Sequence, residues 1–184
     1  MPNYIAIKNN NISLGNYSIV PIRFEDRYSI MDWRNEQLYH LRQEKLLTKE
    51  AQDLYFNNKV NKLFEQEKPE QILFSYLRDS ECIGYGGLVH INWNDRNAEI
   101  SFIMKTELEK FDFELHWNNF LNLIHQVATK ELNFTKTYTY AYDLRPRLYN
   151  ALEDSGYKLE ARLKKHKLVE DKFIDVLIHS KINE

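Results

Sequence analysis

The sequence predicts an α/β (α+β) fold, a single domain over residues 1–184 in which a mixed, mostly antiparallel twisted sheet is flanked by helices. The first observation is the order of elements, because four segments with helical spacing are interspersed with seven segments of strand character. The second is a run of three strands joined by short polar turns, which is typical of antiparallel pairing. The third is composition, since 184 residues with 43% hydrophobic and 28% charged residues suit one globular domain.

The first third of the chain predicts one strand followed by two helices. Residues 17–23 (Y-S-I-V-P-I-R) predict a strand, and Pro21, which has no N–H, places it at an edge of the sheet or makes it start late. Apolar residues at helical spacing predict a helix over residues 25–41. A second helix is predicted to start at Thr48, whose side chain suits an N-cap, and to be closed by Pro69.

The rest of the chain predicts three strands, a helix, a strand, a short helix and two closing strands. In order, these lie over residues 72–78, 82–91, 98–104, 115–132, 135–142, 146–155, 159–169 and 172–182. In the strand over 135–142, alternation puts Tyr138, Tyr140 and Tyr142 on one face. Such a stripe either lines a pocket or packs under a helix, and packing under a helix is the more common arrangement.

Composition excludes several classes of function. The formal net charge of −2 argues against a nucleic-acid partner, because such surfaces are strongly basic. The single cysteine, Cys82, excludes a disulfide framework, and six scattered histidines predict no metal site. No apolar run of about 20 residues predicts a membrane span, and no signal peptide is seen at the start, so we expect a cytoplasmic protein. Motifs of serine hydrolases and of phosphate or dinucleotide loops are also lacking.

Several short motifs follow one another in an informative order. They are W-R-N at residues 33–35, I-G-Y-G-G-L at 83–88, N-A-E-I-S-F-I at 97–103 and G-Y-K-L-E at 156–160. Together with the element order, they resemble the GNAT superfamily of acyl-CoA-dependent N-acyltransferases. The closest likeness is to the branch of ribosomal-protein N-terminal acetyltransferases and nucleotide-amino-sugar N-acetyltransferases. The resemblance spans residues 17–182.

This resemblance implies an N-acetyltransferase. The cosubstrate would be acetyl-CoA, and the acceptor would be a primary amine of an amino sugar or of a peptide N-terminus. Dimers are common in such families, so a homodimer is compatible with the resemblance, although no residue here demands one. No metal is implied.

One segment departs from the family pattern. Relatives carry a Gln/Arg-x-x-Gly-x-Gly/Ala loop before the central helix, where backbone N–H groups bind the pyrophosphate. Residues 105–117 here contain no glycine, and Phe113, Leu115 and Trp117 stand near the usual glycine positions. Four acidic residues in the segment would repel a phosphate. The alternative function is therefore a catalytically degenerate GNAT-fold binding or partner module that does not bind coenzyme A in the usual way.

Two residues are candidates for the chemistry of acyl transfer. The acceptor amine must lose a proton, and a carboxylate in a partly dry cleft suits that task because desolvation raises its pKa. Glu99, which lies among apolar strand residues, is the candidate base; the competing interpretation is a surface glutamate in an ion pair. Relatives have a Tyr general acid where Leu152 stands here, and Tyr149, one turn earlier, is the candidate substitute.

The resemblance also implies binding residues. Cofactor-binding candidates lie at the end of one strand and the start of the following helix: Phe102, Ile103, Met104, Leu115, His116 and Trp117. The first helix borders the acceptor site in relatives, so Trp33, Arg34 and Arg42 are substrate-binding candidates, and either arginine would suit a carboxylate or a phosphate. The competing interpretation of each arginine is an ion pair on the helix surface.

Overall fold

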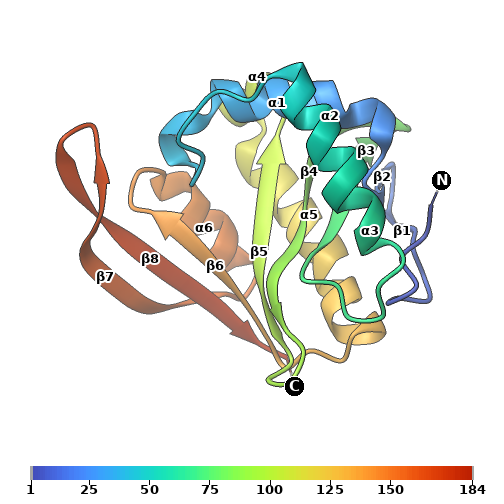
Figure 1. The fold of residues 1–184 in the computed structure, drawn as a ribbon. Coiled ribbons are helices and arrows are strands. Elements are labelled where there is room, and N and C mark those ends of the chain that lie inside the picture. Colours follow the sequence, from blue (N-terminus) through green and yellow to red (C-terminus); the bar gives the residue numbers. More distant parts are fainter. Residues whose placement is uncertain (1, 184) are drawn as a thin grey trace.

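The computed structural model describes residues 2–183 and contains one eight-stranded sheet, with strand order β1-β2-β3-β4-β5-β6-β8-β7 (Figure 1). The strands are β1 (Ile12–Leu14), β2 (Tyr17–Pro21), β3 (Ile72–Arg78), β4 (Glu81–Asn92), β5 (Asn97–Met104), β6 (Lys136–Tyr142), β7 (Lys158–Val169) and β8 (Lys172–Ile182). All neighbouring strands are antiparallel except β5 and β6, which are parallel. The predicted mixed, mostly antiparallel sheet is confirmed.

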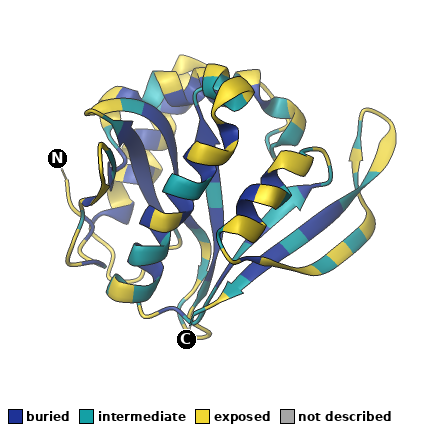
Figure 2. Cartoon of the chain, turned by 180° about the vertical axis from the view of Figure 1, so that it is seen from behind, coloured by how far each residue is buried: buried dark blue, intermediate teal, exposed yellow. Residues whose placement is uncertain are grey.

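Helices cover both faces of this sheet. They are α1 (Arg27–Glu36), α2 (Lys49–Tyr55), α3 (Asn61–Leu63), α4 (Thr106–Phe111), α5 (Phe113–Gln126) and α6 (Pro146–Asp154). The helices α2 and α3 cross the face that is turned to the viewer in Figure 1, whereas α5 and α6 cover the opposite face, seen in Figure 2. Within residues 2–183, no helix is long and apolar enough to cross a membrane.

The apolar stripe of α5 forms the centre of the core on one face. Phe113, Trp117, Phe120, Leu121 and Ile124 are all buried, and their spacing puts them on one side of the helix. The ring of Phe120 stacks on Phe102 of β5 with centroids 4.1 Å apart. This packing fixes α5 against the strand that carries Glu99.

The glycines of β4 allow that close approach. A Cβ atom at Gly86 would overlap the carbonyl oxygen of Ser101 and lie 2.8 Å from the ring of Phe120. We therefore expect Gly86→Ala to lower the free energy of unfolding by about 3 kcal/mol, the cost of overpacking a well-packed core. Urea denaturation measures this.

Gly15→Asn is the control for Gly86→Ala. No atom lies within 4 Å of a Cβ at Gly15, and asparagine tolerates its φ of +60°. We expect this control to change stability by less than about 1 kcal/mol. Wild-type stability in Gly86→Ala would contradict the close packing of α5 on β4.

The sheet opens between β5 and β6. These strands pair only from Asn97 to Glu99 with Lys136 to Tyr138, and beyond this point they diverge. Within the described residues, no strand pairs with the β6-facing side of β5 from Ile100 to Met104. The divergence leaves a V-shaped gap with free backbone groups on its walls.

Three element predictions are corrected. The strand at Tyr17–Pro21 is not at an edge, because β1 pairs with its other side; Pro21 is tolerated as its last residue. The predicted helix over 25–41 is split into a 3-10 turn, α1 and a second 3-10 turn at Leu38–His40. The central helix begins at Phe113, not at residue 115, and the expected loop before it contains α4.

The N-cap at Thr48 is confirmed, since its side chain accepts a hydrogen bond from the Ala51 N–H.

Candidate active site

A cleft of about 530 Å³ occupies the gap between β5 and β6. Its floor comes from both strands, and its sides come from α5, α6, β4 and the segment after α1. The charged or titratable side chains that line it are Arg34, His40, Arg42, Glu70, His90, Glu99, Tyr140, Tyr142 and Arg145. An apolar part is lined by Leu41, Phe102, Ile103, Trp117 and Leu148.

Glu99 lies where β5 and β6 separate. It is the last residue of β5 that pairs with β6, opposite Tyr138. Its residue is 5% exposed, and burial raises the pKa of its carboxyl to about 7, although Arg42 acts in the opposite direction. A carboxyl group with this pKa is partly ionised at neutral pH and can accept a proton within the cleft.

Arg42 covers Glu99. Its guanidinium forms an ion pair with the Glu99 carboxylate and lies over the Tyr140 ring, 4.4 Å from the centroid. His90 completes this group, with its Nε2 3.2 Å from Arg42 and 3.9 Å from the carboxylate. The ion pair was the competing interpretation of both residues, but it forms inside the cleft, with Glu99 buried.

The W-R-N motif of α1 divides into three roles. Trp33 is buried in the hydrophobic core and does not line the cleft. Arg34 lines the cleft and donates hydrogen bonds to Gln43 Oε1 (2.8 Å) and the Tyr85 hydroxyl (2.5 Å). Asn35 accepts from the Leu47 N–H and donates to its carbonyl, which fixes the segment after α1 against the helix.

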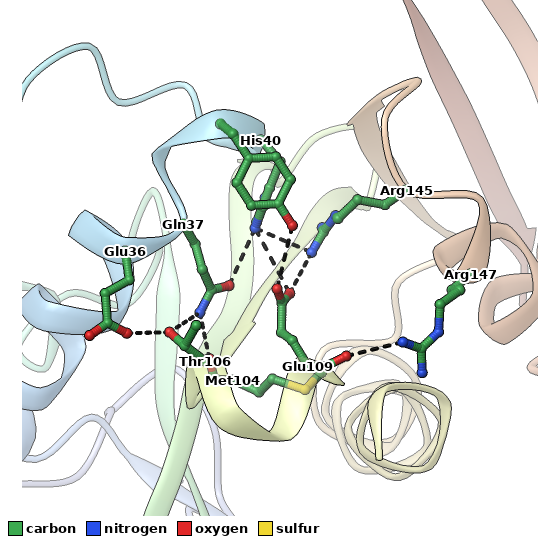
Figure 3. Close-up of polar contacts among 9 residues, drawn as sticks. Glu36, Gln37, His40, Met104, Thr106, Glu109, Arg145 and Arg147 are labelled. Atoms are coloured by element: carbon green, nitrogen blue, oxygen red, sulfur yellow. Dashed lines mark hydrogen bonds and ion pairs between the residues drawn. The ribbon is translucent and has the colours of Figure 1, made fainter. Parts of the chain in front are cut away.

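At the far end of the cleft, α4 lies behind Arg145, which lines the cleft. Figure 3 shows Glu109 of α4 directed at Arg145, which precedes α6, and the carboxylate lies 2.9 Å from the guanidinium. Arg145 is also 3.2 Å from His40 Nε2, and Arg147 donates to the Glu109 carbonyl. Burial raises the pKa of Glu109 and lowers that of His40 to about 3, so His40 is neutral. Glu109 is therefore the counter-ion of Arg145.

Further contacts hold α4 against α1. Gln37 donates from Nε2 to the Met104 carbonyl (2.8 Å) and to Thr106 Oγ1 (3.1 Å), as drawn in Figure 3. The Thr106 hydroxyl in turn donates to Glu36. The segment that carries a glycine-containing loop in the resembled family is thus a short helix fixed at both ends.

The predicted cofactor-binding residues fall into two groups. Phe102, Ile103 and Trp117 line the cleft. Met104, Leu115 and His116 do not: Met104 is buried, Leu115 is half-exposed, and His116 is buried with its Nδ1 3.2 Å from the Tyr76 hydroxyl. The divergence of β5 from β6 exposes the first group, whereas the first turn of α5 directs Leu115 and His116 away from the cleft.

Tyr149, the candidate general acid, lies outside the cleft lining. Its hydroxyl donates to Asp143 Oδ1 (2.8 Å), and its ring stacks on His179. Burial raises the pKa of Tyr149, which makes it a weaker acid. This placement gives no support to a role in protonating a leaving thiolate.

The tyrosine stripe of β6 faces the cleft, which corrects the interpretation that it packs under a helix. Tyr140 and Tyr142 line the cleft, and Thr139 and Ala141 line it as well, because the sheet is open beside this end of β6. Thr137, which lies where β6 still pairs with β5, is buried. The buried hydroxyl of Thr137 forms a hydrogen bond with the Tyr157 hydroxyl (2.8 Å).

Four residues of the site were missed by the sequence analysis: His40, His90, Glu109 and Arg145. His90 lies in an irregularity of β4 and has a left-handed backbone (φ +48°), which directs its imidazole beside Glu99. Glu109 lay in the acidic segment that was identified, but its partner Arg145 is 36 residues away. Only the absence of glycine and proline over 105–117 could have indicated a helix there.

Comparisons with known proteins show which family and which solved structures this chain is similar to. A family model described as an acetyltransferase (GNAT) domain matches residues 19–178. Spermidine N-acetyltransferase from Vibrio cholerae, solved with CoA and spermine, is similar with a TM-score of 0.78 at 17% identity, over 92% of this chain and 96% of that chain. A dodecameric structure of the Vibrio cholerae spermidine N-acetyltransferase has a TM-score of 0.72 at 19% identity, over 92% and 95% of the two chains. Comparison with curated protein sequences finds no match. The family match covers most of the chain, and the chain therefore belongs to the GNAT acetyltransferase family.

Proposed function

We propose that the protein is an N-acetyltransferase that moves an acetyl group from acetyl-CoA to a primary amine. The observation that carries this proposal is Glu99, a buried carboxyl with a pKa of about 7 at the point where β5 and β6 diverge. Family membership supports the same reaction. An amino sugar or a peptide N-terminus stays the predicted acceptor, and a polyamine is the acceptor named for the solved neighbour.

Glu99 supplies the base in this proposal. An ammonium group has no lone pair, so the acceptor must lose a proton before it attacks the thioester, and Glu99 takes that proton directly or through a water molecule. The C–N bond then forms as the C–S bond of the thioester breaks, and the second proton of the amine passes to the departing thiolate, so that CoA leaves as a thiol. Arg42 has a 44% exposed side chain, so it can turn from Glu99 into solvent when the acceptor enters. The unpaired backbone N–H groups of β5 near Ile103 are placed to stabilise the developing oxyanion.

The donor site uses the apolar half of the cleft. Phe102, Ile103 and Trp117 would contact the pantetheine arm, and the free edge of β5 would bind its amide groups. The phosphates would have to bind near α4, which presents Glu109 rather than a glycine-containing loop. Arg145 and Arg147 are the nearby cations.

A thermal unfolding series with acetyl-CoA, free CoA and no ligand tests the proposal. A ligand at 100 times its Kd adds about 2.7 kcal/mol of stability, which is a rise in Tm of about 5–10 °C for a chain of this size. We expect a saturable rise with both CoA species. ATP serves as the control for general nucleotide binding, and no shift up to millimolar acetyl-CoA would contradict the proposal.

A second function, a binding or partner module without coenzyme A, is favoured by one observation. The ion pair with Glu109 already gives Arg145, a cation that lines the cleft, a counter-ion from the chain itself. In that case the unfolding series shows no shift, and partner proteins become the ligands to screen. A homodimer is compatible with both functions, and sedimentation velocity measures whether the protein is a monomer or a dimer in solution.

A further inference from the structure

The charged side chains of the cleft are paired, with one exception. Arg42 pairs with Glu99, Arg145 with Glu109, and Glu70 with Lys59. Arg34 also lines the cleft, but within residues 2–183 its hydrogen-bond partners are neutral and it forms no ion pair. A guanidinium in a partly buried site without a counter-ion is costly, and an anionic ligand offsets that cost.

The surroundings of Arg34 hold its guanidinium in place. Its Nε donates to Gln43, and Gln43 is itself fixed by its hydrogen bond to Asn35 Oδ1 (3.0 Å). Its Nη1 donates to Tyr85, a buried residue of β4. These contacts use two of the five N–H donors of the guanidinium, so a planar fork remains for a ligand.

We propose that Arg34 binds an anionic group of the acceptor, so that the preferred acceptor is an amine that also carries a carboxylate or a phosphate. This inference rests on the proposed function. The lining side chains of the cleft comprise three arginines and two glutamates, which gives a formal charge of +1 with the histidines neutral. A polyamine would meet Arg34 and Arg42 as like charges, whereas an anionic amine gains a charge-assisted hydrogen bond at Arg34 and presents its amine to Glu99.

Matched amines test the inference. The pairs are glucosamine with glucosamine 6-phosphate, and alanyl-alanine with its C-terminal amide; spermidine is the cationic probe. In the wild type, we expect kcat/KM to favour the anionic member of at least one pair by about 10- to 100-fold, the range for a hydrogen bond to a charged group. The pair that shows the preference distinguishes phosphate from carboxylate. Equal rates within both pairs, or a preference for spermidine, would overturn the inference.

Variants then assign the preference to Arg34. Arg34→Gln is expected to bring the ratio within each pair close to one, and Arg34→Lys to retain part of it, because lysine keeps the charge without the fork. Arg96→Gln, at an exposed arginine in the turn between β4 and β5, is expected to keep the wild-type ratio. Because each ratio is measured within one variant, a change in the folded fraction cancels. A wild-type ratio in Arg34→Gln would contradict the role.

Binding is measured in parallel, so that this inference and the proposed function can fail separately. Calorimetric titration of the same amines, with and without saturating CoA, reports the preference without acetyl transfer. Turnover without an anionic preference rejects the inference and keeps the proposed function. The protein could instead bind the anionic amines preferentially, lose that preference in Arg34→Gln, and acetylate none of them. This result would support the anion site and reject the proposed acetyltransferase function. Inorganic phosphate is titrated as a further probe. If it binds as tightly as the anionic amine, the site does not recognise the amine, and the inference is also rejected.

Discussion

Replacing Glu99 with glutamine is expected to lower kcat for acetyl transfer at least about 100-fold. The substitution keeps the shape of the side chain but removes the group that accepts the proton of the acceptor amine, and general-base catalysis is worth about 10²–10⁴-fold. Acetyl-CoA binding should stay close to wild type, because Glu99 lies at the acceptor end of the cleft. Steady-state kinetics with a saturating amine, combined with the acetyl-CoA unfolding series, measures both quantities.

The pH dependence gives this prediction a signature that a structural defect would not share. Burial raises the pKa of Glu99 to about 7, so the wild-type rate should rise as pH increases and level off above that value. The rate of Glu99→Gln should instead keep rising with pH, because only solvent then deprotonates the amine.

The same raised pKa has the opposite effect on stability. Between about pH 4.5 and 7 the folded state keeps the Glu99 proton that the unfolded chain releases, so the contribution of Glu99 to the free energy of unfolding decreases as pH rises through this range.

Glu160→Gln is the matched control. Glu160 is a strand glutamate too, but it is exposed on β7 and pairs with Lys136 at 2.7 Å. We expect its kcat and pH profile to match the wild type, because a surface ion pair contributes little. Wild-type turnover in Glu99→Gln would reject Glu99 as the base.

The apolar neighbours of Glu99 indicated its burial, whereas its role as the base stays a prediction. The third strand of the antiparallel run carries apolar neighbours on both sides of Glu99, which buries the strand. Burial in turn raises the pKa of Glu99. The strand pattern also fits a glutamate in a surface ion pair, and it was the resemblance to the family that made Glu99 the candidate base. The glycines of β4 were quoted as a family motif, and the structure gives their reason in the contact of Gly86 with Ser101 and Phe120.

The partners of Glu99 could not be predicted in the same way. Arg42 reaches it from a segment without regular structure, and His90 does so through a left-handed residue in a strand irregularity. Periodicity describes neither case, because it applies to regular elements. The tyrosine stripe shows a related limit: alternation identified the two faces of β6, but it did not state which face would be covered.

The expectation for residues 105–117 was based on the absence of glycine from this segment. Its acidic and apolar residues include no helix breaker, so T-E-L-E-K-F at 106–111 has ordinary helix-forming composition. The resemblance suggested a loop with its glycines replaced, and the structure has α4 instead. The function of the acidic residues was therefore assigned as repulsion of phosphate in general, whereas Glu109 has a specific partner in Arg145.

Replacing Glu109 with glutamine is expected to tighten acetyl-CoA binding by about 10-fold, which corresponds to about 1.4 kcal/mol. In the proposed donor site the wild-type carboxylate would repel the phosphates, and it is the counter-ion of Arg145. Removing its charge ends the repulsion and makes the guanidinium available to a phosphate. Titration calorimetry with acetyl-CoA and with free CoA measures the change.

The same substitution should act in the opposite direction on the free protein. Arg145 is largely buried, and without Glu109 its nearest neighbour at the site is neutral His40. Breaking a buried ion pair on one side leaves an uncompensated charge, so the Tm without ligand is expected to fall. The rise in Tm on adding acetyl-CoA should then be larger than in the wild type, because the phosphates replace the missing counter-ion.

Glu107→Gln separates this effect from a general loss of negative charge. Glu107 lies on the same helix, but it is exposed, and its ion pair is with Lys105, at 3.3 Å. We expect it to leave Tm unchanged and to alter CoA affinity by less than about threefold, since water and salt screen exposed charges. If both variants bind acetyl-CoA equally, the acidic helix acts through its net charge alone. If Glu109→Gln binds more weakly than the wild type, the carboxylate supports the phosphate site, and α4 has to be a structural part of it rather than a competitor.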